Sequence, residues 1–464
     1  MNKYKILLKD TGIFAFGKLG SKLILFLLVP LYTHYLTSTE FGSADLVFTF
    51  SQFIVPTISV VIFDALVRFG LQKGTAKENV LLNSYLVLFF DMIICVFLML
   101  VLKQYEPIAK WIWYLYTIVI LDILIEIELN YLKVCDRNSF YSLVSIFQTF
   151  VLAVLNVLFL AVLHFGVRGY LLANIFSLIT SATIIFFGGK YYKDLIKAKI
   201  DLKLLKEMVA FSSPLILNNL SWVIIQSSDK IMVEYFLSAS ALGLYSVATK
   251  IPSLINVAVS IFQQSWGLSS IKEAESSGDR DFYSNVFRVY YTSIFFIGLV
   301  INAFIKPFMK IYVGSEFFDS WRYVPILLIS ACFSGVAAYY AALYVASKKT
   351  INNMITAIIG AIINIGLNLI LIPQIGVWGA IVSTFVSYSV IAIVRMLDIR
   401  RKISLKIDWP LFTLNSIILI LQALTISFNF YTLYITLFTM AVFLLINKKT
   451  IGMTLKGFKA LIVR

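Results

Sequence analysis

Among the basic residues inside long apolar runs of this sequence, five are candidates for a binding site: Lys18, Lys22, Arg68, Lys250 and Arg288. A charged side chain near the middle of a bilayer costs about 2.5 to 3.5 kcal/mol on insertion scales, so within a membrane span it faces water or a partner. Ammonium and guanidinium groups in such a place bind phosphate and carboxylate groups. These residue types therefore predict a hydrated, electropositive passage that accepts an anionic ligand.

The depth of each basic residue in its run distinguishes the candidates. Lys22 lies about 20 Å along a helix from the last lysine of the N-terminal tail, too deep to reach that surface. Lys18 is one turn nearer on the same face, where it can either line a cavity or reach the surface. Lys250 precedes Pro252, which is expected to kink its helix and free a carbonyl. Arg288 lies about 10 Å into its run, where reaching the headgroups is an equal alternative.

Among the acidic residues of the apolar runs, four are candidates for a second chemistry: Asp64, Asp122, Glu126 and Asp229. Because buried carboxylates can carry a proton or bind Na⁺, we expect either no cofactor or one of these coupling ions. Asp122 and Glu126 are four residues apart and therefore share a helix face. No grouping of residues predicts a metal site or a catalytic centre.

Two of these carboxylates have basic neighbours in the sequence. Asp64 and Arg68 are four residues apart, so an ion pair between them would satisfy both charges without any substrate. Asp229 stands next to Lys230. We expect Asp229 to pair with a lysine of another helix, and ion coupling is the alternative.

The elements that position these residues are predicted to be membrane-spanning helices. Hydrophobic residues make up 60% of the 464 residues and charged residues 14%, with a mean hydropathy of +0.89. A helix needs about 20 apolar residues to cross the hydrocarbon core. We predict an all-α polytopic membrane protein of about fourteen transmembrane helices, at residues 11–35, 44–69, 80–102, 108–132, 141–163, 168–188, 209–236, 242–270, 283–305, 324–346, 351–372, 376–396, 411–428 and 431–447.

The net charge of +15 is concentrated in loops on one side of these helices. Of the 39 Lys and Arg residues, 28 lie in the loops on the side of the two termini or at the adjacent helix ends. The opposite loops hold six, namely Lys103, Lys110, Arg168, Lys306, Lys310 and Arg322. By the positive-inside rule both termini are cytoplasmic. Because the basic residues are used for orientation, nucleic acid is not a predicted partner.

The loops are too short to hold a separate domain. None exceeds about 20 residues, which excludes a catalytic domain with its own core, so we predict a transporter and not an enzyme. The linker over residues 189–208 places Ile196, Ile200 and Leu204 at helical spacing among six lysines. It is interpreted either as an amphipathic helix on an anionic leaflet or as a basic tether.

An internal repeat predicts how the helices are grouped. LTSTEFG at 36–42 and LSASALG at 237–243 follow spans that lie six apart on the same side of the membrane. We interpret them as copies in two parallel repeats that enclose a central cleft. The predicted organisation is a six-helix lobe at 1–188, the cytoplasmic linker at 189–208, a second six-helix lobe at 209–396, and two extra helices with a basic cytoplasmic tail at 397–464.

Four segments in both predicted lobes carry a resemblance to a known family: FGKLGSKLILFLLVPLYTHYLTSTEFG at 16–42, FDALVRFGL at 63–71, FSSPLILNNLSWVIIQSSDKIMVEYFLSASALGLYSVATKI at 211–251 and PQIGVWGAIVSTFVSY at 373–388. In them the chain resembles the polysaccharide-transport flippases of the multidrug/oligosaccharidyl-lipid/polysaccharide exporter superfamily. Members of that family have two six-helix lobes and two extra helices. The family's usual substrate-contacting cations correspond to Lys18 or Lys22, to Arg68 and to Lys250.

The resemblance implies a substrate and a location. The expected substrate is an oligosaccharide on polyprenyl pyrophosphate, such as a repeat unit of O-antigen, lipopolysaccharide, capsule or exopolysaccharide. It would cross a bacterial inner membrane by alternating access. We expect a monomer that can associate with a glycan polymerase or with glycosyltransferases. The alternative is an ion-coupled multidrug or cation exporter of the same fold, whose cleft should be anionic.

Overall fold

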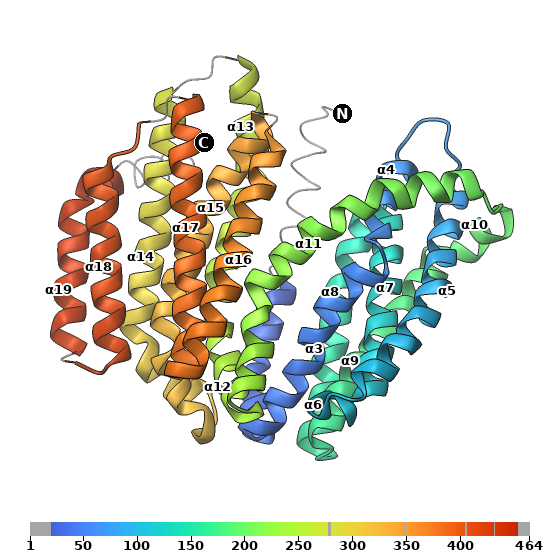
Figure 1. Cartoon of the computed structure of the whole chain (residues 1–464), viewed down its shortest axis with the longest axis horizontal. Coiled ribbons are helices and arrows are strands. Elements are labelled where there is room, and N and C mark those ends of the chain that lie inside the picture. The colour runs from blue at the N-terminus through green and yellow to red at the C-terminus, as the bar shows by residue number, and fades with distance from the viewer. Residues whose placement is uncertain (1–19, 277–279, 348, 404–405, 431, 453–464) are drawn as a thin grey trace. The chain divides into compact units, whose positions relative to one another are not determined.

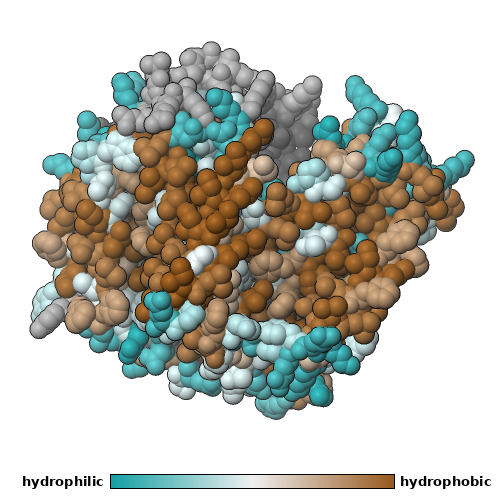
Figure 2. All heavy atoms as spheres, viewed as in Figure 1, coloured by the Kyte–Doolittle hydropathy of each residue, from teal (hydrophilic) through white to brown (hydrophobic). Residues whose placement is uncertain are grey.

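The computed structural model describes residues 20–276, 280–347, 349–403, 406–430 and 432–452. These residues form helices and no strand, which confirms the predicted all-α fold. Ten described helices are long and apolar enough to cross a membrane, or eleven if the bent pair Ala239–Lys250 and Ser253–Gln263 is one span. On the face shown in Figure 2, apolar residues gather along the middle of the helices and hydrophilic residues gather toward their ends.

Three of the fourteen predicted ranges are not among these ten or eleven helices. The range 11–35 lies partly outside the described residues. The helix at Ile112–Val134 is 23 residues long but carries the carboxylates of Asp122, Glu126 and Glu128. The last helix has only 15 residues. Each of the three ranges nevertheless coincides with helical backbone where the structure describes it.

The chain divides into two compact units, residues 1–243 and 244–464. The helices of the first unit (Figure 1) are α2 (Val29–Tyr35), α3 (Ser38–Ile58), α4 (Ile62–Gly70), α5 (Lys77–Leu102), α6 (Glu106–Ala109), α7 (Ile112–Val134), α8 (Asn138–Asn156) with a π-helical turn at Val157–Val162, α9 (Gly166–Gly188), α10 (Tyr191–Lys197) and α11 (Leu202–Phe236). Helix α7 contacts α3, α4, α5, α8 and α9. Helix α11 contacts α3, α4 and α5, which is why the division falls beyond the linker at 189–208.

Helix α12 (Ala239–Lys250) begins at the end of the first unit and continues into the second. The other helices of the second unit are α13 (Ser253–Ser276), α14 (Arg280–Tyr312), a 3₁₀ helix at Ser315–Arg322, α15 (Val324–Ala346), α16 (Thr350–Ile375), α17 (Val377–Ile403), α18 (Trp409–Ser427) and α19 (Thr432–Ile446). Helix α15 is the core of this unit, because it contacts α13, α14, α16, α17 and α18.

Arg395 on α17 is fully buried in the second unit, at 0% exposure. Its guanidinium donates to the Thr356 hydroxyl at 2.9 Å, the Ala337 carbonyl at 2.9 Å and the Asn353 carbonyl at 3.2 Å. It thus joins α17 to α15 and α16. A planar guanidinium can reach three separate acceptors, and a single ammonium group has no such fixed fork.

Arg395→Lys is therefore expected to destabilise the protein by about 2 kcal/mol, the usual value for a lost hydrogen bond to a charged group. The measurement is the midpoint of thermal unfolding in detergent. Arg322→Lys is the control, because the Arg322 side chain is 56% exposed. Equal midpoints for the two variants would contradict a structural role for Arg395.

Two breaks interrupt predicted spans. The predicted kink at Pro252 is confirmed, since α12 and α13 are bent by 41° at this point. The Ser253 hydroxyl donates to the Lys250 carbonyl at 2.5 Å. A second break separates α3 from α4, where Val60 and Val61 adopt left-handed backbone with φ of 49° and 52°. Left-handed backbone is unfavourable for β-branched residues, so this break in the predicted 44–69 helix is a strained one.

The linker does not form a single amphipathic helix, which is one of the two interpretations of its sequence. Helix α10 ends at Lys197, and α11 begins at Leu202 with the Asp201 carboxylate accepting from the Leu204 N–H. Asp201 also exchanges backbone hydrogen bonds with the Asn83 amide of α5. Because Asp201 is held by its own cap and by Asn83, the helical phase is lost between Ile196 and Leu204.

The linker is fixed to the first unit at a buried tyrosine. Tyr191 is 1% exposed, and its hydroxyl donates to the Glu128 carbonyl at 2.7 Å. The Tyr131 hydroxyl donates to the Asp194 carboxylate at 3.1 Å. The linker is therefore held by α7 as well as by α5.

The repeated motifs at 36–42 and 237–243 contact each other within the first unit. The hydroxyls of Ser38 and Ser240 are 2.7 Å apart. A Cβ atom added to Gly42 would lie 1.8 Å from the Ala239 carbonyl oxygen, and one added to Gly243 would lie 2.0 Å from the Ser38 carbonyl oxygen. Ser38 and Ala239 occupy the same position in the two motifs. The glycine of each motif therefore contacts the equivalent residue of the other motif. This reciprocal geometry supports the interpretation of the motifs as two copies of one element.

Candidate functional site

The candidate site lies along one face of α3, whose start is set by a capping box. The Thr37 hydroxyl accepts from the Glu40 N–H, and the Glu40 carboxylate accepts from the Thr37 N–H. The helix therefore begins at Ser38, which places Asp45 about 10 Å inside the helix. Asp45, Thr49 and Gln52 follow at helical spacing and share one face of α3.

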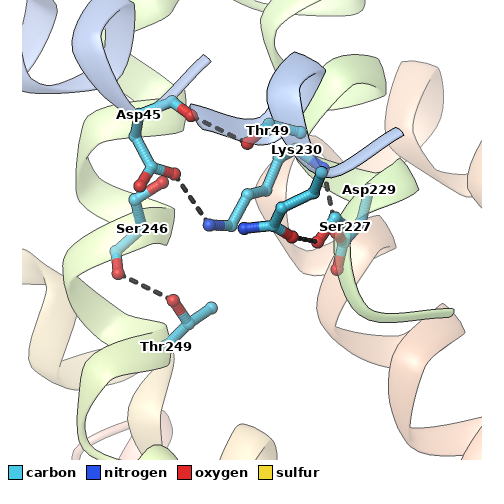
Figure 3. A network of polar contacts seen from close by, with 8 residues as sticks. Asp45, Thr49, Ser227, Asp229, Lys230, Ser246 and Thr249 are labelled. Carbon is cyan, nitrogen blue, oxygen red and sulfur yellow. Dashed lines mark hydrogen bonds and ion pairs between the residues drawn. The ribbon is translucent and has the colours of Figure 1, made fainter. Parts of the chain in front are cut away.

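An ion pair joins this face to α11. The Lys230 ammonium lies 2.7 Å from the Asp45 carboxylate, and the two side chains are only 12% and 7% exposed (Figure 3). The Thr49 hydroxyl donates to the Asp45 carbonyl at 2.8 Å. Removing one partner of such a buried pair leaves the other charge uncompensated, which is more unfavourable than removing both. Asp45 and Lys230 therefore act as a unit.

Further polar contacts extend this pair along α11. The Ser227 hydroxyl donates to the Gln52 side-chain oxygen at 2.8 Å. The Tyr105 hydroxyl, from the loop after α5, donates to the Glu234 carboxylate. Burial and the hydrogen bond to Glu234 raise the pKa of Tyr105, so its hydroxyl stays protonated and acts as the donor.

A different side of α3 contacts the predicted acidic face of α7. The Ser51 hydroxyl donates to the Asp122 carboxylate at 2.9 Å. Glu126, one turn further along α7, is exposed and accepts from the Asn130 amide at 3.1 Å. Of the two carboxylates predicted on this face, Asp122 contacts α3, whereas Glu126 contacts a residue of its own helix.

This arrangement can respond to charge in two ways. An anionic ligand that reaches Lys230 would compete with Asp45 for the ammonium group, and a proton on Asp45 would break the ion pair. Either event would release α3 from α11 at this point. Asp45 and Lys230 are therefore candidates for coupling ligand or proton binding to helix movement.

The structure places the predicted lysines as follows. Lys18 lies outside the described residues. Lys22 stands in the helical stretch 20–27, where its side chain is exposed, and no ion pair joins it to any residue that the structure describes. Lys250 is half-buried at the last position of α12, immediately before the bend.

The two predicted arginines each contact a different group from the one the sequence suggests. No ion pair joins Asp64 to Arg68, both of which are described and exposed. The Arg68 guanidinium instead lies 4.7 Å from the ring centroid of Phe211 on α11, because the fold brings this aromatic face over the end of α4. Arg288 pairs with Asp408, the residue before α18, at 2.8 Å.

Asp229 is buried at 2% exposure, and its carboxylate accepts from the Lys230 backbone N–H at 2.9 Å. The acidic partner of the Lys230 ammonium is Asp45, which sequence reasoning missed. Starting the second span at residue 44 made Asp45 a surface residue. The capping box formed by Thr37 and Glu40 was the signal that would have moved the start of this helix outward.

A comparison with protein families now adds to this geometry. Residues 7–266 match the model of the family described as "Polysaccharide biosynthesis protein". The chain belongs to the polysaccharide biosynthesis protein family. The match contains α3, α7 and α11. It therefore contains every residue of the Asp45–Lys230 network, by which we mean Asp45, Thr49, Gln52, Tyr105, Ser227, Lys230 and Glu234.

One curated relative supports this assignment at low identity. It is "Lsg locus putative protein 1" of Haemophilus influenzae, which is 22% identical over 261 residues. The aligned region is 54% of this family member's chain and spans 62% of the relative's length.

Solved structures show that this family member shares its fold with transporters. The lipid II flippase MurJ, in an inward closed conformation, has a TM-score of 0.70 at 12% identity. The alignment covers 96% of this chain and 100% of the MurJ chain. An inward-facing multidrug resistance MATE family transporter of the MOP superfamily has a TM-score of 0.67 at 15% identity, with 82% of this chain and 94% of that chain covered. A MOP superfamily transporter from Pyrococcus furiosus has a TM-score of 0.60 at 15% identity, over 86% of this chain and 95% of that chain.

Proposed function

We propose that this chain is a flippase that moves an oligosaccharide on polyprenyl pyrophosphate from the cytoplasmic to the outer face of a bacterial inner membrane. The family match carries this proposal, because it links the chain to polysaccharide biosynthesis over more than half of its length. The likeness to the MurJ fold supports it, since that protein is a lipid II flippase. The short loops agree with a transporter and not an enzyme.

The chemistry of the substrate matches the basic residues in the helices. A pyrophosphate carries negative charge that needs cationic partners in a site shielded from bulk water. We propose that Lys22 and Lys250 contact the pyrophosphate, that Arg68 contributes from the end of α4, and that Lys18 extends the site toward the cytoplasm. Arg288 is already paired with Asp408, so we assign it a secondary role.

The alternating step would use charge exchange at α3. An incoming pyrophosphate near Lys230 would weaken its pair with Asp45. We propose that a coupling ion, H⁺ or Na⁺, acts on Asp45 or on the carboxylates of Asp229 and Asp122. A cation exporter of the same fold is the second candidate, favoured by the likeness to the MATE transporter.

Replacing Lys22 or Lys250 with glutamate tests the proposal. Reversing one charge beside a pyrophosphate turns attraction into repulsion, so we expect the flipped product to fall by about tenfold or more, which corresponds to at least 1.4 kcal/mol. The measurement is lipid-linked oligosaccharide that accumulates on the cytoplasmic face of cells depleted of the native protein. Lys73→Glu is the matched control, because Lys73 is an exposed lysine in the loop after α4.

Two outcomes would contradict the proposal. Normal surface polysaccharide from both charge-reversed variants would remove the two lysines from the site. Loss of resistance to cationic drugs on depletion, without any accumulated oligosaccharide, would favour the exporter.

A further inference from the structure

The first unit has an open recess of about 530 Å³ on the side opposite to the predicted cytoplasmic termini. It is formed by the beginnings of α3, α6 and α9 and by the residues just before α7 and α9. The residues that give it chemical character are Glu40, Glu106, Lys110, Trp111, His164 and Arg168. None of these residues belongs to the Asp45–Lys230 network.

The charged groups of the recess are not neutralised by one another. All of them lie in the described part of the chain, and no ion pair joins Glu40 or Glu106 to Lys110, His164 or Arg168. Lys110 and Arg168 are two of only six basic residues that the sequence places in loops on this side. Basic residues are scarce on this side, so two of them in one recess, together with a histidine, are a local concentration.

The walls of the recess keep these groups available. The Glu40 carboxylate uses its Oε2 atom to accept from the Thr37 N–H and hydroxyl at 3.0 and 3.1 Å. Its Oε1 atom lies 3.5 Å from the position that a Cβ atom of Gly166 would occupy. Gly166 has a φ of 56°, so glycine suits this turn, and no side chain there crowds the carboxylate. The Lys110 ammonium lies 5.0 Å from the Trp111 ring centroid.

The mixture of groups selects a class of ligand. An inorganic or phospholipid phosphate would meet the carboxylates of Glu40 and Glu106 as well as the basic groups, which reduces the net attraction. A saccharide has hydroxyls that both donate and accept, so carboxylates can accept from it while Lys110 and Arg168 donate to it. The volume of the recess also lies within the range of about 300 to 1,000 Å³ that small-molecule sites have.

We propose that this recess binds the saccharide part of the lipid-linked glycan on the outer side of the membrane. The inference rests on the proposed flippase function and adds a separate saccharide site to it. The lysines within the helices contact the pyrophosphate, and the recess contacts sugar hydroxyls. A saccharide site on the outer side holds the glycan after translocation and so opposes its movement back to the cytoplasmic face.

The test is calorimetric titration of the purified full-length protein with repeat-unit oligosaccharide, released from its lipid by mild acid from the cells that make this protein. Wild-type protein should bind it saturably. Glu106→Gln and Arg168→Gln should each raise Kd, and the double variant should raise it by about tenfold or more. Both side chains are exposed and make no described hydrogen bond, so the variants should fold. Arg322→Gln is the control, because Arg322 is an exposed arginine at the end of the 3₁₀ helix of the second unit.

Two outcomes would overturn the inference: no binding of the oligosaccharide by the wild type, or equal Kd for the wild type and the double variant. Failure of the flippase function has a different signature. In that case, depletion of the protein would not cause lipid-linked oligosaccharide to accumulate on the cytoplasmic face. If oligosaccharide accumulates on depletion but the double variant binds normally, only the saccharide recess is wrong.

Discussion

Replacing Lys230 with alanine is expected to destabilise the protein by about 3 to 5 kcal/mol, because it leaves the buried Asp45 carboxylate without its partner. Asp45→Ala should have a similar effect for the opposite reason, since the ammonium group would be left unpaired. The two side chains are 7% and 12% exposed, so water cannot replace the missing partner well. The measurement is the midpoint of thermal unfolding in detergent, together with the flipping assay.

The double variant Asp45→Asn/Lys230→Gln distinguishes the effect of losing the ion pair from the effect of leaving one charge unpaired. It removes both charges and keeps groups that can hydrogen-bond, so it should be more stable than either single alanine variant. Lys73→Ala, in an exposed loop, is the control for loss of a lysine. If both single variants unfold at the wild-type temperature, Asp45 and Lys230 do not act as a unit. If the double variant is stable but does not flip the glycan, the ion pair takes part in the transport cycle.

Leucine in place of Gly42 or Gly243 is expected to separate the two copies of the repeated motif. A Cβ atom alone would lie 1.8 Å or 2.0 Å from a backbone carbonyl oxygen, far closer than any atoms can pack. Neither contact can be relieved by moving a flexible side chain, because the obstructing atoms belong to the backbone. The helix ends must therefore move apart.

A disulfide between Ser38→Cys and Ser240→Cys reports this separation. The two hydroxyls are 2.7 Å apart, so the cysteine pair should oxidise readily in the otherwise native protein. Adding Gly42→Leu should lower the cross-linked fraction by about tenfold or more. Gly366→Leu is the matched control, since no atom lies within 4 Å of its added Cβ position. Equal cross-linking in both leucine variants would show that this contact is not rigid.

The cross-linked protein also tests whether the contact opens during transport. If the motifs must separate to admit or release substrate, oxidation should stop flipping and reduction should restore it. Continued flipping by the oxidised protein would make the contact a permanent structural one. The reciprocal packing of Gly42 and Gly243 makes this experiment symmetric, since either glycine can be replaced.

Features that depend on residues close together in the sequence could be predicted. The all-helical membrane fold follows from long apolar runs, and the bend at Pro252 follows from the missing N–H and the bulk of the proline ring. The acidic face of α7 follows from the spacing of Asp122 and Glu126. The capping box at Thr37 and Glu40 was also visible in the sequence, and applying it would have identified Asp45 as an intramembrane residue.

Only the tertiary structure decided which charges are paired. Local spacing favours Asp64 with Arg68, yet Arg68 lies over Phe211, which comes from a helix far along the chain. Lys230 pairs with Asp45 on α3 and not with the neighbouring Asp229, because adjacent residues on a helix point about 100° apart. The three acceptors of Arg395 likewise come from other helices.

The amino-acid sequence by itself determined the membrane class, the helix-forming segments and the chemical types available inside them, since these depend on apolar run length and local spacing. The tertiary structure decided which buried charge meets which partner, where the linker breaks, and which loop residues share a recess. These properties depend on packing between helices separated by up to about two hundred residues, and residue spacing along one helix carries no information about the distance to another.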